Sequence, residues 1–139
     1  MADSQPADPT PDTWVLRFDW VDEPNRVVEA SFAGCVVRHP ADVAVWEQAV
    51  RTELARFGRD LVLLIDLHEL HVRPRASSPF GAARARVLAD FTRRSFRFGG
   101  DMWTKTSINT SFAMHGADSN LFPTRQAALE AIQAYLDAG

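Results

Sequence analysis

Apolar and polar residues alternate along the first part of the chain, which is the pattern of a strand with one buried face. The aromatic-rich face of the first expected strand consists of Trp14, Leu16, Phe18 and Trp20. The sequence Asp22-Glu23-Pro24-Asn25 has the composition of a turn, because proline fixes φ and asparagine tolerates the left-handed region. A second alternating stretch, 26–32, follows and ends at Gly34. The pattern predicts a β-hairpin over residues 13–33.

Three stretches repeat apolar residues at helical spacing, and each begins with a helix-start signal. The first opens at His39-Pro40-Ala41-Asp42 and stops at Gly58. The second starts at Ser78-Pro79, with the serine as the expected cap, and Gly99-Gly100 closes that segment. The third covers Arg125–Leu136, with Thr124 as its cap. Their apolar faces contain Val43, Trp46, Val50, Leu54 and Phe57; Phe80, Ala83, Val87, Leu88 and Phe91; and Ala128, Leu129, Ile132, Tyr135 and Leu136, respectively.

Two further strands are expected between these helices. Leu61-Val62-Leu63-Leu64-Ile65 is a continuous apolar run, which is typical of a central parallel strand covered on both faces, and Asp66 lies at its C-terminal end. Residues 102–114 alternate and are rich in threonine, so they predict a long last strand. The stretch Leu67–Ala76 is interpreted as a loop.

The elements follow in the order ββαβαβα, which places the chain in the α/β class. Because crossovers between parallel strands are right-handed, we expect a mixed four-stranded sheet whose helices cover mainly one face. Residues 1–12 are rich in proline and small polar residues, so they predict a disordered leader. A single domain is expected over residues 13–139.

Composition and charge narrow the class of protein. Of the 139 residues, 46% are apolar and 24% are charged, as in an ordinary globular domain. No apolar run approaches the roughly 20 residues that span a bilayer, and the N-terminus lacks the regions of a secretory signal, so we expect no membrane span. The single cysteine, Cys35, cannot form an internal disulfide, which favours a cytoplasmic location. A net charge of −3 argues against a nucleic-acid partner.

Four stretches, taken in order, resemble the STAS superfamily, the sulphate transporter and anti-sigma factor antagonist domains. Residues 27–34 are similar to the family's second strand, which ends in a glycine, and Leu61–Asp66 to its central strand, which ends in an aspartate. Ala76-Ser77-Ser78-Pro79-Phe80 stands where the family carries an Asp-Ser-Ser-Gly-Leu type motif. Residues 121–129, with Leu-Phe-Pro-Thr followed by Ala-Ala-Leu, look like its closing helix. Because Ala76 and Pro79 replace an acid and a glycine, the chain resembles a divergent, short, stand-alone member.

The resemblance implies a non-enzymatic regulatory module that acts by binding a protein partner. In family members that act as switches, the serine at the start of helix two is phosphorylated, so Ser77 and Ser78 are phosphoacceptor candidates. A phosphate there adds roughly −1.5 to −2 charge beside a helix N-terminus, whose N–H groups favour anions. The expected partner-binding residues are Arg73, Arg75, Phe80 and Arg84.

Two alternatives use other surfaces of the same fold. A homo-oligomeric scaffold would associate through the sheet face that the helices leave uncovered, where Trp14 and Trp20 would be available. A small-molecule or lipid-binding domain would use a pocket between the sheet and the helices.

Candidate chemistry is sparse along the chain. No catalytic constellation, cofactor motif or metal signature is apparent in the sequence, so we expect no enzyme, no cofactor and no metal. His68 and His71 are interpreted as surface loop residues, and Cys35 as a buried structural cysteine.

Overall fold

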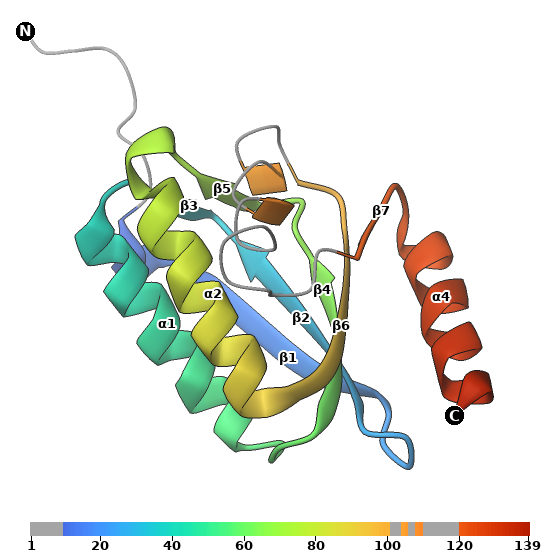
Figure 1. Ribbon diagram of the computed structural model, residues 1–139. Helices are drawn as coiled ribbons and strands as arrows, with labels where there is room; N and C mark the ends of the chain where they lie inside the picture. The colour runs from blue at the N-terminus through green and yellow to red at the C-terminus, as the bar shows by residue number, and fades with distance from the viewer. Residues whose placement is uncertain (1–9, 101–103, 106–107, 110–119) are drawn as a thin grey trace, which may run out of the picture.

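The computed structural model describes residues 10–100, 104–105, 108–109 and 120–139. Within these ranges the protein is an α/β domain with a mixed five-stranded sheet in the order β1-β2-β4-β6-β7 and a separate pair, β3-β5. The strands of the main sheet are β1 (Val15–Asp22), β2 (Val27–Ala33), β4 (Leu61–Asp66), β6 (Thr92–Phe98) and β7 (Leu121–Phe122). The long helices are α1 (Pro40–Ala55), α2 (Ser77–Phe91) and α4 (Arg125–Ala138). Figure 1 shows the sheet between α1 and α2 on one side and α4 on the other.

The predicted leader lies largely outside the described residues, which begin at Thr10. Its last residues belong to a short 3-10 helix, η1 (Pro11–Thr13), that leads into β1.

The predicted hairpin is confirmed, since β1 and β2 pair antiparallel. Its aromatic face turns toward α1: Phe18 is buried, and the Trp20 ring lies 5.2 Å from the ring of Phe57. Trp14 also packs against this core, so neither tryptophan lies on the uncovered sheet face. The opposite face of β1 consists of the exposed residues Val15, Arg17, Asp19 and Val21.

The apolar run at β4 is the central strand, as predicted. It pairs in parallel with β2 on one side and with β6 on the other. Leu63 packs in the cluster beneath α1 and α2, whereas Leu64 packs in the cluster beneath α4. Both faces of this strand are therefore covered, which explains the absence of alternation in its sequence.

The strand predicted over residues 102–114 is wrong in the part that the structure describes, because residues 104–105 and 108–109 are helical. The rest of that stretch lies outside the described residues. The next parallel strand is instead β6, which begins directly after α2. Thr92 takes an extended conformation (φ −123°, ψ 149°), and its hydroxyl donates to the Leu88 carbonyl at 2.8 Å. A β-branched residue favours this extended geometry, so the helix ends at Phe91.

The stretch Leu67–Ala76, predicted to be a loop, contains β5 (Leu70–Val72) and a 3-10 helix, η2 (Pro74–Ala76). β5 pairs in parallel with β3 (Cys35–Val37), which directly precedes α1. All three residues of β3 are buried. These strands are too short for their alternation to stand out in the sequence.

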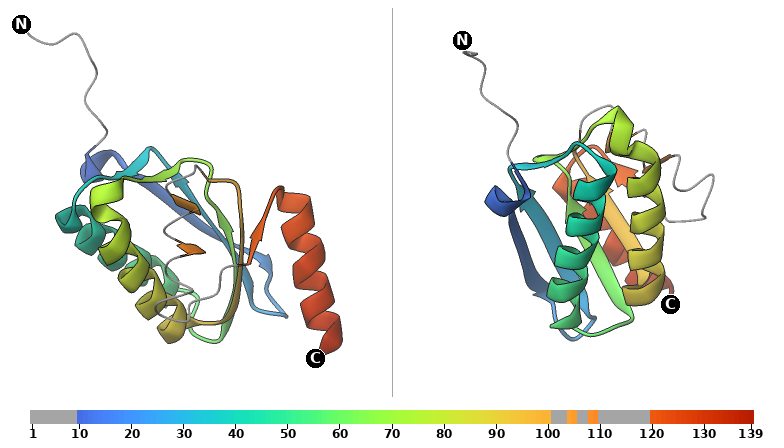
Figure 2. Two further views of the ribbon diagram at one scale, coloured as in Figure 1. Left: turned by 45° about the horizontal axis from the view of Figure 1, so that its top comes forward. Right: turned by 90° about the vertical axis from the view of Figure 1, so that its left-hand side faces the viewer.

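Helices cover both faces of the sheet, which corrects the expectation of helices mainly on one face. α4 packs Ala128 and Ile132 against Val62, Leu64 and Phe96, on the side opposite α1 and α2. The left-hand view of Figure 2 shows α4, in red, on the opposite side of the sheet from α1 and α2. The predicted cap is confirmed, because the Thr124 hydroxyl accepts from the Ala127 N–H at 3.1 Å. Among the described residues, no helix is long and apolar enough to cross a membrane.

Candidate functional site: a cavity lined by two arginines

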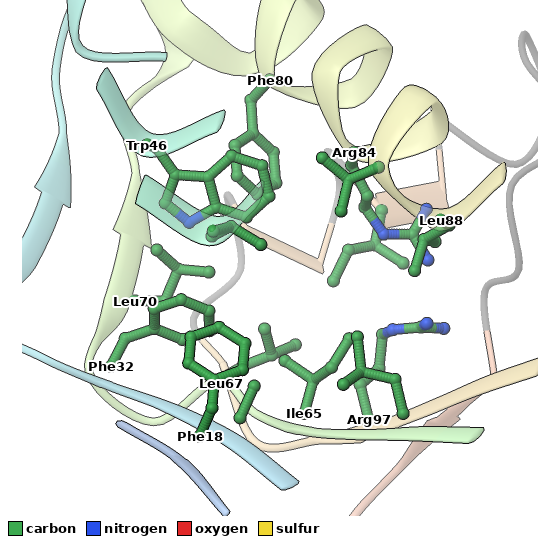
Figure 3. A pocket seen from close by; sticks show the side chains of 15 residues that line it. Phe18, Phe32, Trp46, Ile65, Leu67, Leu70, Phe80, Arg84, Leu88 and Arg97 are labelled. Carbon is green, nitrogen blue, oxygen red and sulfur yellow. The ribbon is translucent and has the colours of Figure 1, made fainter. Parts of the chain in front are cut away.

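A cavity lies between the sheet and the layer formed by α1 and α2, and 15 residues line it (Figure 3). One part of its wall is aromatic. The ring centroids of Trp46 and Phe80 are 4.7 Å apart, and those of Phe32 and Trp46 are 6.4 Å apart. The space open to the centre of a water-sized molecule measures about 30 Å³. That volume corresponds to roughly two water molecules.

Two arginines on different elements complete the wall. Arg84 on α2 is 5% exposed and Arg97 on β6 is 0% exposed. In Figure 3 both lie away from the aromatic rings, with Arg84 reaching from the helix and Arg97 from the strand below it. Because an arginine guanidinium stays protonated in proteins, each of these residues places a positive charge beside the cavity, while the surface that faces the cavity is almost entirely apolar. The remaining lining side chains are apolar apart from the indole N–H of Trp46.

A local network fixes Arg97 in the wall. Its Nη1 donates to the Asn120 carbonyl at 3.4 Å, and its Nη2 donates to the Ser95 hydroxyl. The Asn120 amide in turn donates to the Ser95 carbonyl at 3.0 Å. Arg84 and Arg97 also take part in further interactions of the chain. Asn120, the residue before β7, therefore helps to hold the Arg97 side chain beside the cavity.

The predicted partner-binding residues separate into a surface group and a buried group. Arg75 is exposed and its Nη1 lies 3.4 Å from Nδ1 of His39, while Arg73 is half-buried. Phe80 and Arg84, at 1% and 5% exposure, do not form a surface for a partner. That part of the prediction is wrong, because residues four apart share one helix face and this face of α2 turns toward the sheet.

Ser77 and Ser78 lie in the first turn of α2, but Ser78 is not its cap. The N-cap is Ala76, without a side-chain cap hydrogen bond, because η2 runs directly into α2 and the Ser77 N–H donates to the Pro74 carbonyl. Ser78 is exposed and Ser77 is half-buried. Phosphorylation of either serine stays a prediction.

His68 is held at the C-terminal end of β4. Its Nδ1 lies 2.7 Å from Oδ1 of Asp66, and its ring packs edge-on against Phe98, with centroids 5.7 Å apart. The exposed position of His68 agrees with the surface interpretation, whereas His71 is half-buried in β5. No group of histidine, cysteine and acidic side chains in the described ranges could hold a metal ion.

Cys35 is fully buried, as predicted. Burial, followed by the charge of Glu69, raises the pKa of its thiol to about 12. The thiolate needed for nucleophilic chemistry is therefore scarce near neutral pH.

Arg97 is not identified as a site residue from the sequence, because the segment of the second helix is expected to continue to Gly99-Gly100. A usable signal was present. Ser95 and Arg97 alternate with Phe96 and Phe98, which is a strand pattern with one apolar and one polar face.

Comparison with known proteins provides no relative. No protein-family model, curated protein or solved structure matches the chain. The resemblance to STAS domains stays a prediction.

Proposed function

We propose that this domain binds a small organic anion, a short-chain carboxylate, in the cavity between its sheet and its helices. The observation that carries the proposal is the pair Arg84 and Arg97, at 5% and 0% exposure in the wall of an otherwise apolar cavity. Of the interpretations that the sequence leaves open, this is the small-molecule-binding one.

The energetics of buried charge support a role for these arginines beyond packing. Both arginines have partners within the chain. Even so, replacing a paired buried charge by apolar side chains of similar volume is often neutral or stabilising. A guanidinium also matches the two oxygens of a carboxylate in a bidentate pair. A carboxylate near Arg84 and Arg97 would place the apolar end of the ligand against the aromatic wall. The indole N–H of Trp46, which is buried with no partner among the described residues, is a further donor in that wall.

The size of the cavity selects among anions. A space of about 30 Å³ for the centres of water-sized molecules accommodates a ligand of a few heavy atoms. Acetate and propionate suit this volume, whereas a long acyl chain requires the aromatic wall to move. The proposed ligand is therefore a short-chain carboxylate and not a lipid.

Isothermal titration calorimetry of the full chain with acetate, propionate, butyrate and octanoate tests the proposal, with propionamide as the neutral control. We expect binding of the two shortest acids and none of the amide. Arg84→Met should weaken binding at least tenfold, since a charged hydrogen bond is worth about 1.5–3 kcal/mol. Arg86→Met, on the same helix but paired with Glu47 on the surface, should leave the affinity unchanged.

Two outcomes contradict the proposal. One is the absence of heat and of chemical-shift changes at Arg84 and Arg97 at millimolar acid. The other is equal binding of acid and amide, which would show that the cavity selects shape and not charge. Circular dichroism of Arg84→Met establishes that this variant is folded, so that loss of binding is not loss of structure.

A regulated protein contact at the start of α2 is a second candidate, favoured by the exposure of Ser78 in the first helical turn beside the exposed Arg75. Mass spectrometry of the native protein, purified under phosphatase inhibition, tests it. A stoichiometric partner that is lost on Ser78→Asp but kept on Ser78→Ala supports the switch. Recovery of the unmodified chain alone contradicts it.

A further inference from the structure

β1 forms one edge of the main sheet. It pairs with β2 on one side only, and the order β1-β2-β4-β6-β7 places it at the end of the sheet. The right-hand view of Figure 2 shows β1, in dark blue, along one side of the molecule with no other described strand beyond it. An edge strand offers backbone N–H and C=O groups to another strand.

The exposed face of β1 is unusually apolar at its two ends and charged between them. Val15 and Val21 are 53% and 40% exposed, and they are two of the three exposed large hydrophobic residues in the described part of the chain. Arg17 and Asp19 lie between them on the same face. In the described ranges neither Arg17 nor Asp19 forms an ion pair with another residue.

This arrangement is complementary to itself when the strand is reversed. If a second β1 runs antiparallel with Phe18 opposite Phe18, Arg17 lies opposite Asp19 and Asp19 opposite Arg17. Val15 then lies opposite Val21 at both ends, where β1 has an irregularity in its pairing with β2 between Trp20 and Asp22. Directly opposed residues of opposite charge, and opposed apolar residues, stabilise an antiparallel pair.

The charges also exclude the neighbouring registers. Side chains that lie opposite each other in an antiparallel pair point to the same face of the sheet. The centre of the pairing, which is the residue that lies opposite its own copy, can therefore move only by whole residues along the strand. A centre at Arg17 places two arginines opposite each other, and a centre at Asp19 places two aspartates opposite each other. Like charges in direct opposition destabilise the pair. A centre at Phe18 is the register that avoids both repulsions and pairs both valines.

We propose that the protein forms a symmetric homodimer in which two β1 strands pair antiparallel about Phe18 and join the two sheets into one. The two-fold axis is perpendicular to the sheet, so the α1–α2 layers of both copies lie on the same side. On that side Leu16 of one copy lies opposite Trp20 of the other. Charges on an edge strand ordinarily prevent association; in this strand their opposite signs, placed symmetrically about Phe18, make them part of the contact.

Sedimentation velocity of the native chain and of charge variants tests the proposal. The native chain, of 15.5 kDa, should sediment as a species of twice that mass at micromolar concentration. Arg17→Asp places aspartates opposite each other, and Asp19→Arg does the same with arginines. Each variant should raise the dimer dissociation constant roughly tenfold or more. Circular dichroism establishes that each variant remains folded.

Mixing the two variants provides the decisive control. In the heterodimer of R17D with D19R, every aspartate at positions 17 and 19 faces an arginine, so an equimolar mixture should recover the dimer that neither variant forms alone. The double variant R17D/D19R should dimerise like the native chain. A native chain that sediments as a monomer at all concentrations overturns the proposal. So does a dimer that both single variants leave intact.

The register has its own test. In V15C/V21C the cysteine at position 15 of one copy lies opposite the cysteine at position 21 of the other, so mild oxidation should give a covalent dimer on a non-reducing gel. V15C alone should not cross-link, because its own copy lies opposite Val21. Cross-linking of V15C alone contradicts the register centred on Phe18.

Discussion

Replacing Phe80 by alanine should destabilise the fold, because the ring is part of the core and not of a contact surface. The side chain is 1% exposed, and its ring centroid lies 4.7 Å from that of Trp46. Truncating a buried phenylalanine to alanine costs about 3–5 kcal/mol, which includes the transfer of the ring and the space left behind. The loss of an aromatic pair worth about 0.5–1.5 kcal/mol places this site in the upper half of that range. We therefore expect a loss of about 4 kcal/mol.

Urea unfolding monitored by tryptophan fluorescence measures this loss. With a typical slope of about 1–3 kcal/mol per molar urea, the midpoint should fall by roughly 2 M. Phe80→Leu keeps most of the volume and should cost less than about 1.5 kcal/mol. Val45→Ala, at a site 46% exposed on α1, should change stability by less than about 0.5 kcal/mol. A loss below about 1 kcal/mol in Phe80→Ala would refute the buried position of the ring.

Three further experiments test other parts of the structure. Gly99 has φ +77°, and a Cβ there would lie 2.9 Å from the His68 ring. Gly99→Ala should therefore cost about 1–2 kcal/mol for the backbone conformation alone, plus the cost of the collision with His68. Thermal unfolding of the two single variants and the double variant should show that the collision cost disappears when His68 is replaced by alanine. Glu47 has a lowered pKa, chiefly because Arg86 donates to it, so its contribution to stability is present above its unfolded pKa and lost as pH falls through the folded value. Glu47→Gln should accordingly be less stable than the native chain by up to about 1 kcal/mol at pH 7, with the difference gone near pH 2; a constant difference would contradict this. Cys35, with a thiol pKa of about 12, should react with a thiol reagent at pH 8 only after denaturant is added; rapid labelling of the folded chain would show that the site is open.

The sequence predicts elements whose side chains share one environment along their length. The first strand alternates because one face of β1 is exposed to solvent, and β4 is uniformly apolar because both its faces are covered. The Thr124 cap is visible because its geometry depends on neighbouring residues alone. These signals are local, and the structure agrees with them.

The errors arise where distant segments decide the structure. Ser95, Phe96, Arg97 and Phe98 form a strand because β4 lies beside them and helices cover both their faces. Nothing near Arg97 in the sequence shows that Arg84 lines the same cavity. The α2 face that carries Phe80 and Arg84 could be predicted to be apolar, but the burial of its arginine could not, because hydropathy assigns arginine to the surface.

Successive side chains of β4 belong to different cores, and this has a consequence for local unfolding of the molecule. Leu61 and Leu63 belong to the core beneath α1 and α2, whereas Val62 and Leu64 belong to the core beneath α4. Detachment of α4 exposes one side of the strand and leaves the other packed, so its amides stay paired with β2 and β6. Hydrogen exchange in β4 should therefore require global unfolding, while α4 exchanges through a smaller opening of its own. Two classes of slowly exchanging amides, one in β4 and a faster one in α4, would be the result expected of a strand shared by two cores.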